Sequence, residues 1–363
     1  MSQGKCFALS PMANRIVCVR RLLIILFCLM ACAAAQADPP NTLRFGVFSL
    51  FKPTRFIIRP VKNQILLVTI AKSGVVLDSE FEVRSSVEGV QVLAGVHRDR
   101  VESLLVTARD GGVVDFAITV PGKITREFRG TLAIAQARHH LQAIITMDRE
   151  LAVASAVKAE APPGAPMEAL KAQAVVARSF YFGSRDRHQD FDFCDTTHCQ
   201  LLKAPPRPED PASIATQQTR GITLRYRGQI VPAMFSASCG GQTRTLADVG
   251  IASGGYPYYS VEDAFCDRNV KRWHARLTSA EAHALAQSHS EHDRLELGRR
   301  VGWNVVPGNN YLVLNDGDAV IFEGKGSGHG LGLCQQGASA MARDGASFRE
   351  ILAHYFPNTT PED

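Results

Sequence analysis

Apolar and polar positions alternate along much of the chain before residue 146. Runs such as 65–70 and 113–120 are rich in β-branched residues, and Gly111-Gly112 and Pro121-Gly122 interrupt them. Alternation bounded by turn residues is typical of strands. The pattern therefore predicts a β-rich module over residues 38–145.

The apolar spacing changes to a helical pattern after Asp148. Val153, Val157 and Glu160 lie on one face of this helix, and the Pro162-Pro163 pair ends it. Glu160 is thus a carboxyl on an otherwise apolar face, in the last turn. Burial and the negative end of the helix dipole both disfavour its charged form, so we expect the raised pKa that a general acid requires. A solvated glutamate at a helix end is the alternative.

A second helix is expected from Pro166 to about Phe182. Lys171 and Arg178 lie two turns apart on one face of it, so both could point toward one anionic or hydroxyl-rich ligand. A solvated basic flank is the alternative. Further along, residues 277–297 have an amphipathic helical pattern.

A cluster of histidines and cysteines follows the second helix. His188, Cys194, His198 and Cys199 are the ligand set that a tetrahedral zinc accepts, and four protein ligands would make the site structural. A Cys194–Cys199 disulfide with two incidental histidines is the alternative. A catalytic zinc is not indicated, because neither a His-Glu-x-x-His helix nor the deaminase signature occurs.

Two glycine-containing segments complete the candidate chemistry. Gly240-Gly241 allows a backbone to approach a ligand closely, and Cys239 could form a disulfide with Cys266. His329 stands among five glycines and has little of its own sequence to pack against, which favours a functional role. Nucleotide binding is not supported, because no phosphate-binding glycine motif is present.

Residues 1–37 have the features of a secretory signal peptide. Basic residues up to Arg21 precede an apolar run shorter than the roughly 20 residues of a membrane span, and Ala35-Gln36-Ala37 offers a cleavage site. Cys32, in a lipoprotein-like sequence, gives the alternative of a lipidated protein tethered to a membrane. Five of the nine cysteines follow this segment, so at least one is free or metal-bound.

Composition is that of an ordinary globular protein, with 45% hydrophobic and 21% charged residues among 363. The net charge of +5 includes the basic residues before the signal, and no Lys/Arg run stands out. A nucleic-acid partner is therefore not expected.

Several motifs occur in the order found in the SpoIID/LytB family, which the chain resembles over residues 123–363. They are Glu160, residues 168–178, Ser238-Cys-Gly-Gly-Gln-Thr243, residues 328–338 around His329, and Ile351-Leu-Ala-His-Tyr355. One departure is Cys334-Gln-Gln-Gly-Ala338, where the family has Ser-Gln-Tyr-Gly-Ala.

The resemblance implies a lytic transglycosylase acting on peptidoglycan glycan strands, some members preferring strands without stem peptides. The family's catalytic glutamate falls on Glu160 and its active-site arginine on Arg178, while Lys171 and His329 would help to position the sugar. Further substrate contacts are expected at Gln173, Ser238, Gly240, Gly241 and Gln335. Some members carry a zinc held by two histidines and two cysteines just after the helix of the active-site arginine. The four residues that resemble that set here are His188, Cys194, His198 and Cys199, and the zinc would be structural.

We therefore expect an exported α+β protein. Its β-rich module would precede a mixed α/β SpoIID-like domain over residues 146–363, with a central cleft between Glu160 and the His329 loop. One carboxyl suffices for a transglycosylase, because the sugar's own 6-hydroxyl replaces the water that hydrolases activate. A non-catalytic cell-wall binder that modifies an amidase and a zinc hydrolase of the cell wall are the alternatives.

Overall fold

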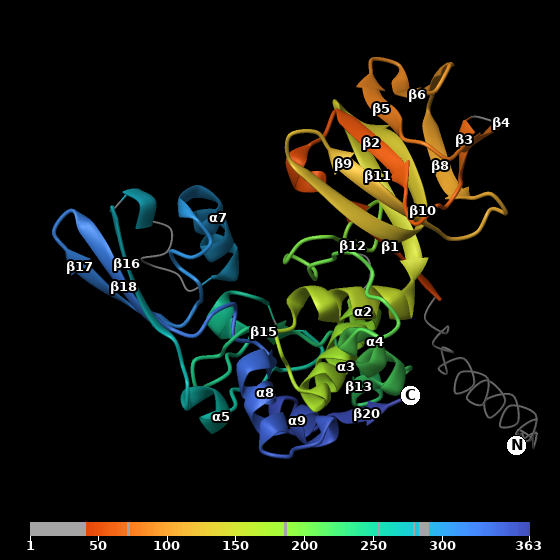
Figure 1. Ribbon diagram of the computed structural model, residues 1–363. Coiled ribbons are helices and arrows are strands. Elements are labelled where there is room, and N and C mark those ends of the chain that lie inside the picture. The colour runs from red at the N-terminus through yellow and green to blue at the C-terminus, as the bar shows by residue number, and fades with distance from the viewer. Residues whose placement is uncertain (1–40, 71–72, 185–186, 253, 279, 283–289) are drawn as a thin grey trace, which may run out of the picture. The chain divides into compact units, whose positions relative to one another are not determined.

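The computed structural model describes residues 41–363, apart from 71–72, 185–186, 253, 279 and 283–289 (Figure 1). The expected signal peptide and the alternative of lipidation at Cys32 lie outside the described residues. Residues Asn41–Asp363 form one compact unit. None of the described helices is both long enough and apolar enough to cross a membrane.

Strands make up the first part of this unit. Burial alternates along them, as in β11, where every second residue from Leu141 to Met147 is buried. The strand-rich pattern expected before residue 146 is thus confirmed. The strands are β1 (Thr42–Val47), β2 (Arg55–Pro60), β3 (Leu66–Ile70), β4 (Ser73–Leu77), β5 (Phe81–Ser86), β6 (Gly89–Ala94), β7 (His97–Val101), β8 (Ser103–Ala108), β9 (Val114–Val120), β10 (Ile124–Ala137) and β11 (His140–Asp148), with the 3-10 helix η1 (Ser49–Phe51) after β1.

Twelve of the described strands form one sheet, with β12 (Phe193–Cys194) at an edge. The main path runs β12-β1-β11-β10-β9-β2-β5-β6-β7, and β8, β3 and β4 branch from it. The long strand β10 pairs with β9 through its first half and with β8 and β11 through its second half. At the edge, β12 runs parallel to β1 and places Cys194 opposite Gly46. The sheet therefore carries one of the expected zinc ligands.

Two helices follow β11 and begin and end close to the expected residues. Helix α2 (Arg149–Glu160) is capped by the side chain of Asp148, which accepts hydrogen bonds from the backbone of Glu150 and Leu151. Helix α3 (Met167–Gly183) begins after Pro166. The mixed α and β character that the sequence indicates is confirmed.

One hydrophobic core joins the sheet to α2 and α3. The ring of Tyr181 on α3 packs edge-on against Phe45 and Phe193, with centroids 5.6 Å and 4.8 Å away. Because this core continues across residue 145, the division into domains 38–145 and 146–363 stays a prediction.

The remaining elements are short. A second core gathers residues of α3, α8 and α9. The elements are α4 (Pro211–Gln218), β13 (Thr223–Tyr226), β14 (Gln229–Ile230), β15 (Phe235–Ser236), η2 (Ala247–Val249), α5 (Ala264–Asp267), β19 (Leu333–Cys334), α8 (Gln335–Arg343), α9 (Phe348–Tyr355) and β20 (Thr360–Glu362).

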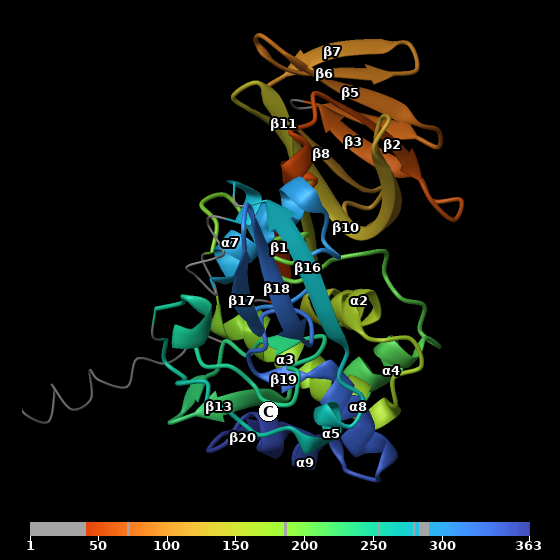
Figure 2. The same cartoon turned by 90° about the vertical axis from the view of Figure 1, so that its left-hand side faces the viewer.

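A separate antiparallel sheet, seen in Figure 2, has the order β16-β18-β17. Strands β17 (Tyr311–Asp316) and β18 (Ala319–Lys325) form the hairpin typical of an Asp-Gly turn. The helix expected over 277–297 is wrong in its first residues, because β16 (Arg272–Thr278) reaches Thr278 and pairs with β18. Ala275 and Leu277 are buried on one face of that strand, whereas helix α7 covers Glu291–Val301.

Candidate functional site

Glu160 ends helix α2 and is half-buried. Its Oε1 accepts a 2.7 Å hydrogen bond from the backbone N–H of Leu201, and the side-chain amide of Gln335 donates to its backbone oxygen at 2.9 Å. Burial raises the pKa of Glu160, although the Leu201 N–H and the charge of Lys203 oppose this effect. The expected direction of the pKa shift is thus confirmed, and the carboxyl is suited to donating a proton.

Leu201 and Lys203 were not recognised from the sequence. The hydrogen bond from Leu201 comes from a backbone N–H, which every residue except proline possesses. Lys203 lies in a proline-rich loop that gives no periodic signal. Only the fold brings this loop to Glu160, across 41 residues of chain.

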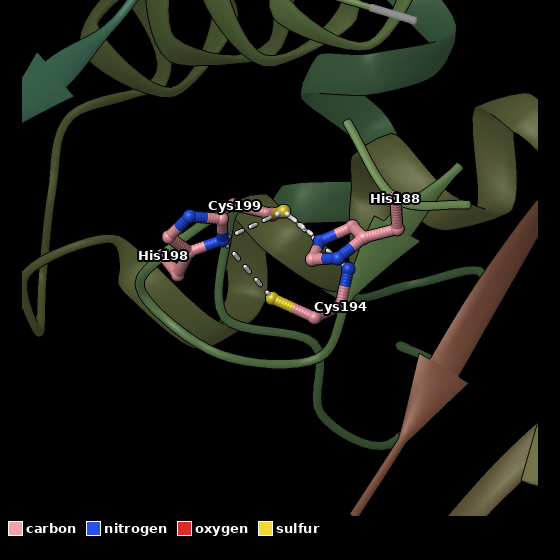
Figure 3. Close-up of side chains that lie close together, drawn as sticks. All are labelled: His188, Cys194, His198 and Cys199. Atoms are coloured by element: carbon pink, nitrogen blue, oxygen red, sulfur yellow. Dashed lines mark hydrogen bonds between the residues drawn. The ribbon is translucent and has the colours of Figure 1, made fainter. Parts of the chain in front are cut away.

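The four expected zinc ligands lie together (Figure 3). His188 Nε2 is 3.4 Å from Cys199 Sγ, and His198 Nδ1 is 3.7 Å from Cys194 Sγ and 3.6 Å from Cys199 Sγ. All four ligand atoms lie within 4.8 Å of one another. Tetrahedral zinc, with bonds of about 2.3 Å to sulfur and 2.0 Å to nitrogen, would separate such atoms by about 3.5 Å. The side chains fit one tetrahedral ion.

The two cysteines of this cluster are free thiols rather than a disulfide. A hydrogen bond with Cys199 lowers the pKa of Cys194 to about 3, against the effect of burial and with help from His198 and Thr196. Each histidine has a ring nitrogen within 3.7 Å of a cysteine sulfur, and this convergence favours the metal over the disulfide. Four protein ligands leave no open position for a catalytic water.

Asp195 anchors the cluster to the sheet. Its buried Oδ2 accepts hydrogen bonds from the guanidinium of Arg126 at 2.7 Å and from the backbone of Phe48 at 3.2 Å. On the other side, Cys199 precedes Leu201 by two residues. The cluster thus holds the start of the loop whose N–H contacts Glu160.

Lys171 and Arg178 do not share a surface that faces a ligand, which corrects the expectation from helical spacing. Arg178 is 0% exposed, and its guanidinium donates to both carboxylate oxygens of Glu150 and to two backbone carbonyls near α4. Lys171 pairs with Glu168 instead, at 2.6 Å. The reason is that α2 brings Glu150 against this part of α3, so the arginine is neutralised inside the protein.

The two glutamines expected to contact the sugar, Gln173 and Gln335, are both buried. Gln173 is 2% exposed, and within the described residues its Nε2 has no hydrogen-bond partner. Gln335 is also buried, and its amide is engaged by the backbone of Glu160. Gln335 therefore lies beside Glu160, whereas Gln173 belongs to the interior.

The segment from Ser238 to Gly241 has a structural role and does not form an open sugar site. Ser238 is buried, exchanges backbone hydrogen bonds of 3.1 Å and 2.9 Å with Ser327, and has its hydroxyl 3.3 Å from Cys266 Sγ. The φ angles of Gly240 and Gly241 are 77° and 99°, which other residues rarely adopt. The expectation of a sugar contact is therefore corrected for Ser238, and the glycine pair has a conformational reason.

His329 is half-buried in the glycine-rich loop. Its Nδ1 accepts a 3.0 Å hydrogen bond from the backbone of Leu331, so the proton of the neutral ring sits on Nε2. Burial lowers the pKa of His329, with Glu291 and Arg294 acting in opposite directions and a hydrogen bond to the backbone of Phe235 opposing the effect of burial. In the described part of the chain no hydrogen bond links His329 to Glu160, and the central cleft stays a prediction.

A cavity of about 530 Å³ lies against the β16-β18-β17 sheet. Trp273 and Tyr311 line it together with charged and polar residues of the three strands. Glu160 and His329 are not among the described residues around this cavity.

Comparison with known proteins gives a consistent picture. Residues 137–226, which include Glu160, Arg178 and the His/Cys cluster, match the family model described as stage II sporulation protein, SpoIID. Over 263 residues the chain is 28% identical to an uncharacterized protein of Brachyspira hyodysenteriae, covering 63% of this chain and 71% of that protein.

Two proteins of Bacillus subtilis are also similar. The amidase enhancer is 24% identical over 280 residues, which span 55% of this chain but only 39% of the enhancer. Stage II sporulation protein D is 23% identical over 260 residues, which span 60% of this chain and 75% of that protein.

Proposed function

We propose, proceeding from the chain's membership of the SpoIID/LytB family, that it acts on the cell wall as a lytic transglycosylase. The substrate would be the peptidoglycan glycan strand, cleaved between N-acetylmuramic acid and N-acetylglucosamine. The observation that carries this proposal is the single half-buried carboxyl of Glu160, whose pKa burial raises. The signal-like sequence of residues 1–37 supports an activity outside the cytoplasm.

Glu160 would act first as acid and then as base. Its Oε1 is held by the Leu201 N–H, and among the described contacts none engages Oε2, which is left to carry the proton. Oε2 would protonate the glycosidic oxygen while the bond from C1 of the muramic acid breaks. The 6-hydroxyl of the same sugar would then attack C1 and return its proton to Oε2. The products are a free 4-hydroxyl and a 1,6-anhydro end, and no water is consumed.

Arg178 would serve as a positioning residue in this reaction. Its bidentate pair with Glu150 fixes the first turn of α2 against α3, and Glu160 stands at the other end of α2. Lys171 and His329 remain the proposed sugar contacts, Lys171 being 19% exposed at its side chain and His329 half-buried in the glycine-rich loop.

A zinc held by His188, Cys194, His198 and Cys199 would be structural. When bound, it would supply a crosslink between the sheet edge at Cys194 and the loop that begins after Cys199. That loop carries Leu201, so the metal site supports the carboxyl without entering the chemistry. The zinc-hydrolase alternative requires an open coordination position, which a four-ligand site does not provide.

The test is digestion of purified glycan strands followed by mass spectrometry of the new ends. We expect 1,6-anhydro ends from the wild-type protein and their loss in Glu160→Gln, which keeps the shape of the side chain. Glu209→Gln, on an exposed glutamate of the same loop region, is the matched control and should retain activity. Reducing ends would show a hydrolase, and wild-type rates in Glu160→Gln would refute the assignment.

The similarity to the amidase enhancer favours a second candidate function, in which the chain binds the cell wall and modifies an amidase. Adding the protein to a cell-wall amidase separates the two. Stimulation by Glu160→Gln as strong as by wild type, without new anhydro ends from either, would support the enhancer role.

A further inference from the structure

A second cluster of metal-binding side chains lies outside the His/Cys site. Cys239, Asp263, Cys266 and Cys334 are all buried, and their ligand atoms lie within 4.8 Å of one another. The three cysteines are free thiols. No titratable side chain of the proposed sugar chemistry belongs to this cluster.

The chain brings these residues together from three separate segments. Cys239 follows β15, Asp263 caps helix α5, which contains Cys266, and Cys334 ends β19. Strands β15 and β19 pair in parallel, and the backbone N–H of Asp263 donates to the Gly241 carbonyl at 2.9 Å. Only short elements hold this region, so a crosslink at the cluster would order much of it.

The electrostatics of the cluster call for a cation. The carboxylate of Asp263 is 0% exposed and accepts hydrogen bonds from the Tyr355 hydroxyl, the Cys239 thiol and the Cys266 backbone. Within the described residues it forms no ion pair with a lysine, arginine or histidine. A buried carboxylate without a counter-charge is costly, and a bound metal ion would provide that charge.

The sulfur of Cys334 accepts two backbone hydrogen bonds. The backbone N–H groups of Cys239 and Gly337 point to Cys334 Sγ at 3.3 Å and 3.4 Å. Such donors stabilise negative charge on sulfur and orient it toward a metal. Ser238 Oγ approaches Cys266 Sγ at 3.3 Å in the same manner.

From this geometry we propose that Cys239, Asp263, Cys266 and Cys334 bind a second, structural zinc ion. Three sulfurs and one carboxylate oxygen are ligands that zinc accepts, and a tetrahedral site with Zn–S bonds of about 2.3 Å separates its sulfurs by about 3.8 Å. That spacing falls within the observed limit of 4.8 Å. A disulfide would use two of the three thiols and leave the buried carboxylate uncompensated.

The second zinc would also support the candidate active site. Cys334 immediately precedes Gln335, whose amide donates to the backbone oxygen of Glu160. Cys334 stands where the family has a serine and is, with Gln336, one of two positions at which this stretch departs from the SpoIID/LytB motif. The cysteine at position 334 thus completes the ligand set.

Metal analysis of the purified protein tests the proposal independently of enzymatic activity. We expect two zinc ions per chain by inductively coupled plasma mass spectrometry. Cys199→Ser and Cys266→Ser should each leave one ion, and the double variant none. One zinc in the wild type that Cys266→Ser does not change would overturn the proposal, as would a second ion that is not zinc.

A second measurement covers the case in which Cys266→Ser fails to fold. The wild-type protein is denatured with a chelator and without reductant, alkylated, and mapped by peptide mass. Alkylation of Cys239, Cys266 and Cys334 supports the metal site. A disulfide joining any two of them overturns it.

Discussion

The backbone N–H of Leu201 donates a 2.7 Å hydrogen bond to Oε1 of Glu160. This contact joins the end of helix α2 to a loop that starts at the His/Cys cluster. It favours the charged carboxylate, whereas burial favours the neutral acid, and burial has the larger effect. The balance between the two decides the pH range in which Glu160 can donate a proton.

The raised pKa of Glu160 gives a pH dependence of stability. The folded protein holds this proton more tightly than the unfolded chain does, whose ordinary value is 4.5. The resulting stability is fully present below that value and is lost as pH rises through the pKa of the folded protein. The free energy of unfolding of wild type, relative to Glu160→Gln, should therefore fall as pH rises above about 4.5. Parallel curves for the two proteins in urea titrations at several pH values would contradict this.

The rate of the proposed reaction should also depend on the protonation of Glu160. Because the protonated carboxyl starts the proposed reaction, the rate of anhydro-end formation should decline as pH rises through the pKa of Glu160. Cys199→Ser, which releases the loop, should weaken the Leu201 contact and move this decline to higher pH. A decline at unchanged pH in a folded Cys199→Ser protein would show that the cluster does not hold the Leu201 contact.

The buried pair of Arg178 and Glu150 should be essential for stability. Removing one partner leaves a buried charge, so Arg178→Met and Glu150→Gln should each cost about 3–5 kcal/mol of unfolding free energy. The double variant should cost less than the sum, because no unpaired charge remains. The measurement is a double-mutant cycle by urea unfolding, with the exposed pair of Arg207 and Glu209 as control, where about 0–1 kcal/mol is expected.

Local patterns predicted the elements around Glu160 well. The change from alternating to helical spacing after Asp148 and the paired prolines that end α2 are each signals encoded by residues that are neighbours in the sequence. The His/Cys set could likewise be proposed because its members lie within twelve residues, 188–199. Proximity in sequence made proximity in space a safe expectation.

Partners that are distant in sequence could not be predicted in this way. Arg178 shares its helical face with Lys171, but its surroundings depend on Glu150, 28 residues earlier on another helix. Cys239 and Cys266 suggested a disulfide in isolation. Cys334 lies beside Cys239 because β15 and β19 pair, and two-residue strands carry no periodic signal. Asp263, three residues before Cys266, reaches this cluster through the hydrogen bond from its N–H to the Gly241 carbonyl.

Tyr355 provides the most specific prediction for the second metal site. Its buried hydroxyl donates a 2.8 Å hydrogen bond to Asp263 Oδ2, and thus orients one proposed ligand. Partners of this kind typically contribute about 10–100-fold to metal affinity. In Tyr355→Phe, a competing chelator should therefore remove the second zinc at a concentration about 10–100-fold lower than in wild type. The zinc at the His/Cys cluster should be released as in wild type. Tyr259→Phe, on a tyrosine that is 37% exposed, is the control and should leave both release steps unchanged. Equal release from Tyr355→Phe and wild type would show that Asp263 does not ligate the metal.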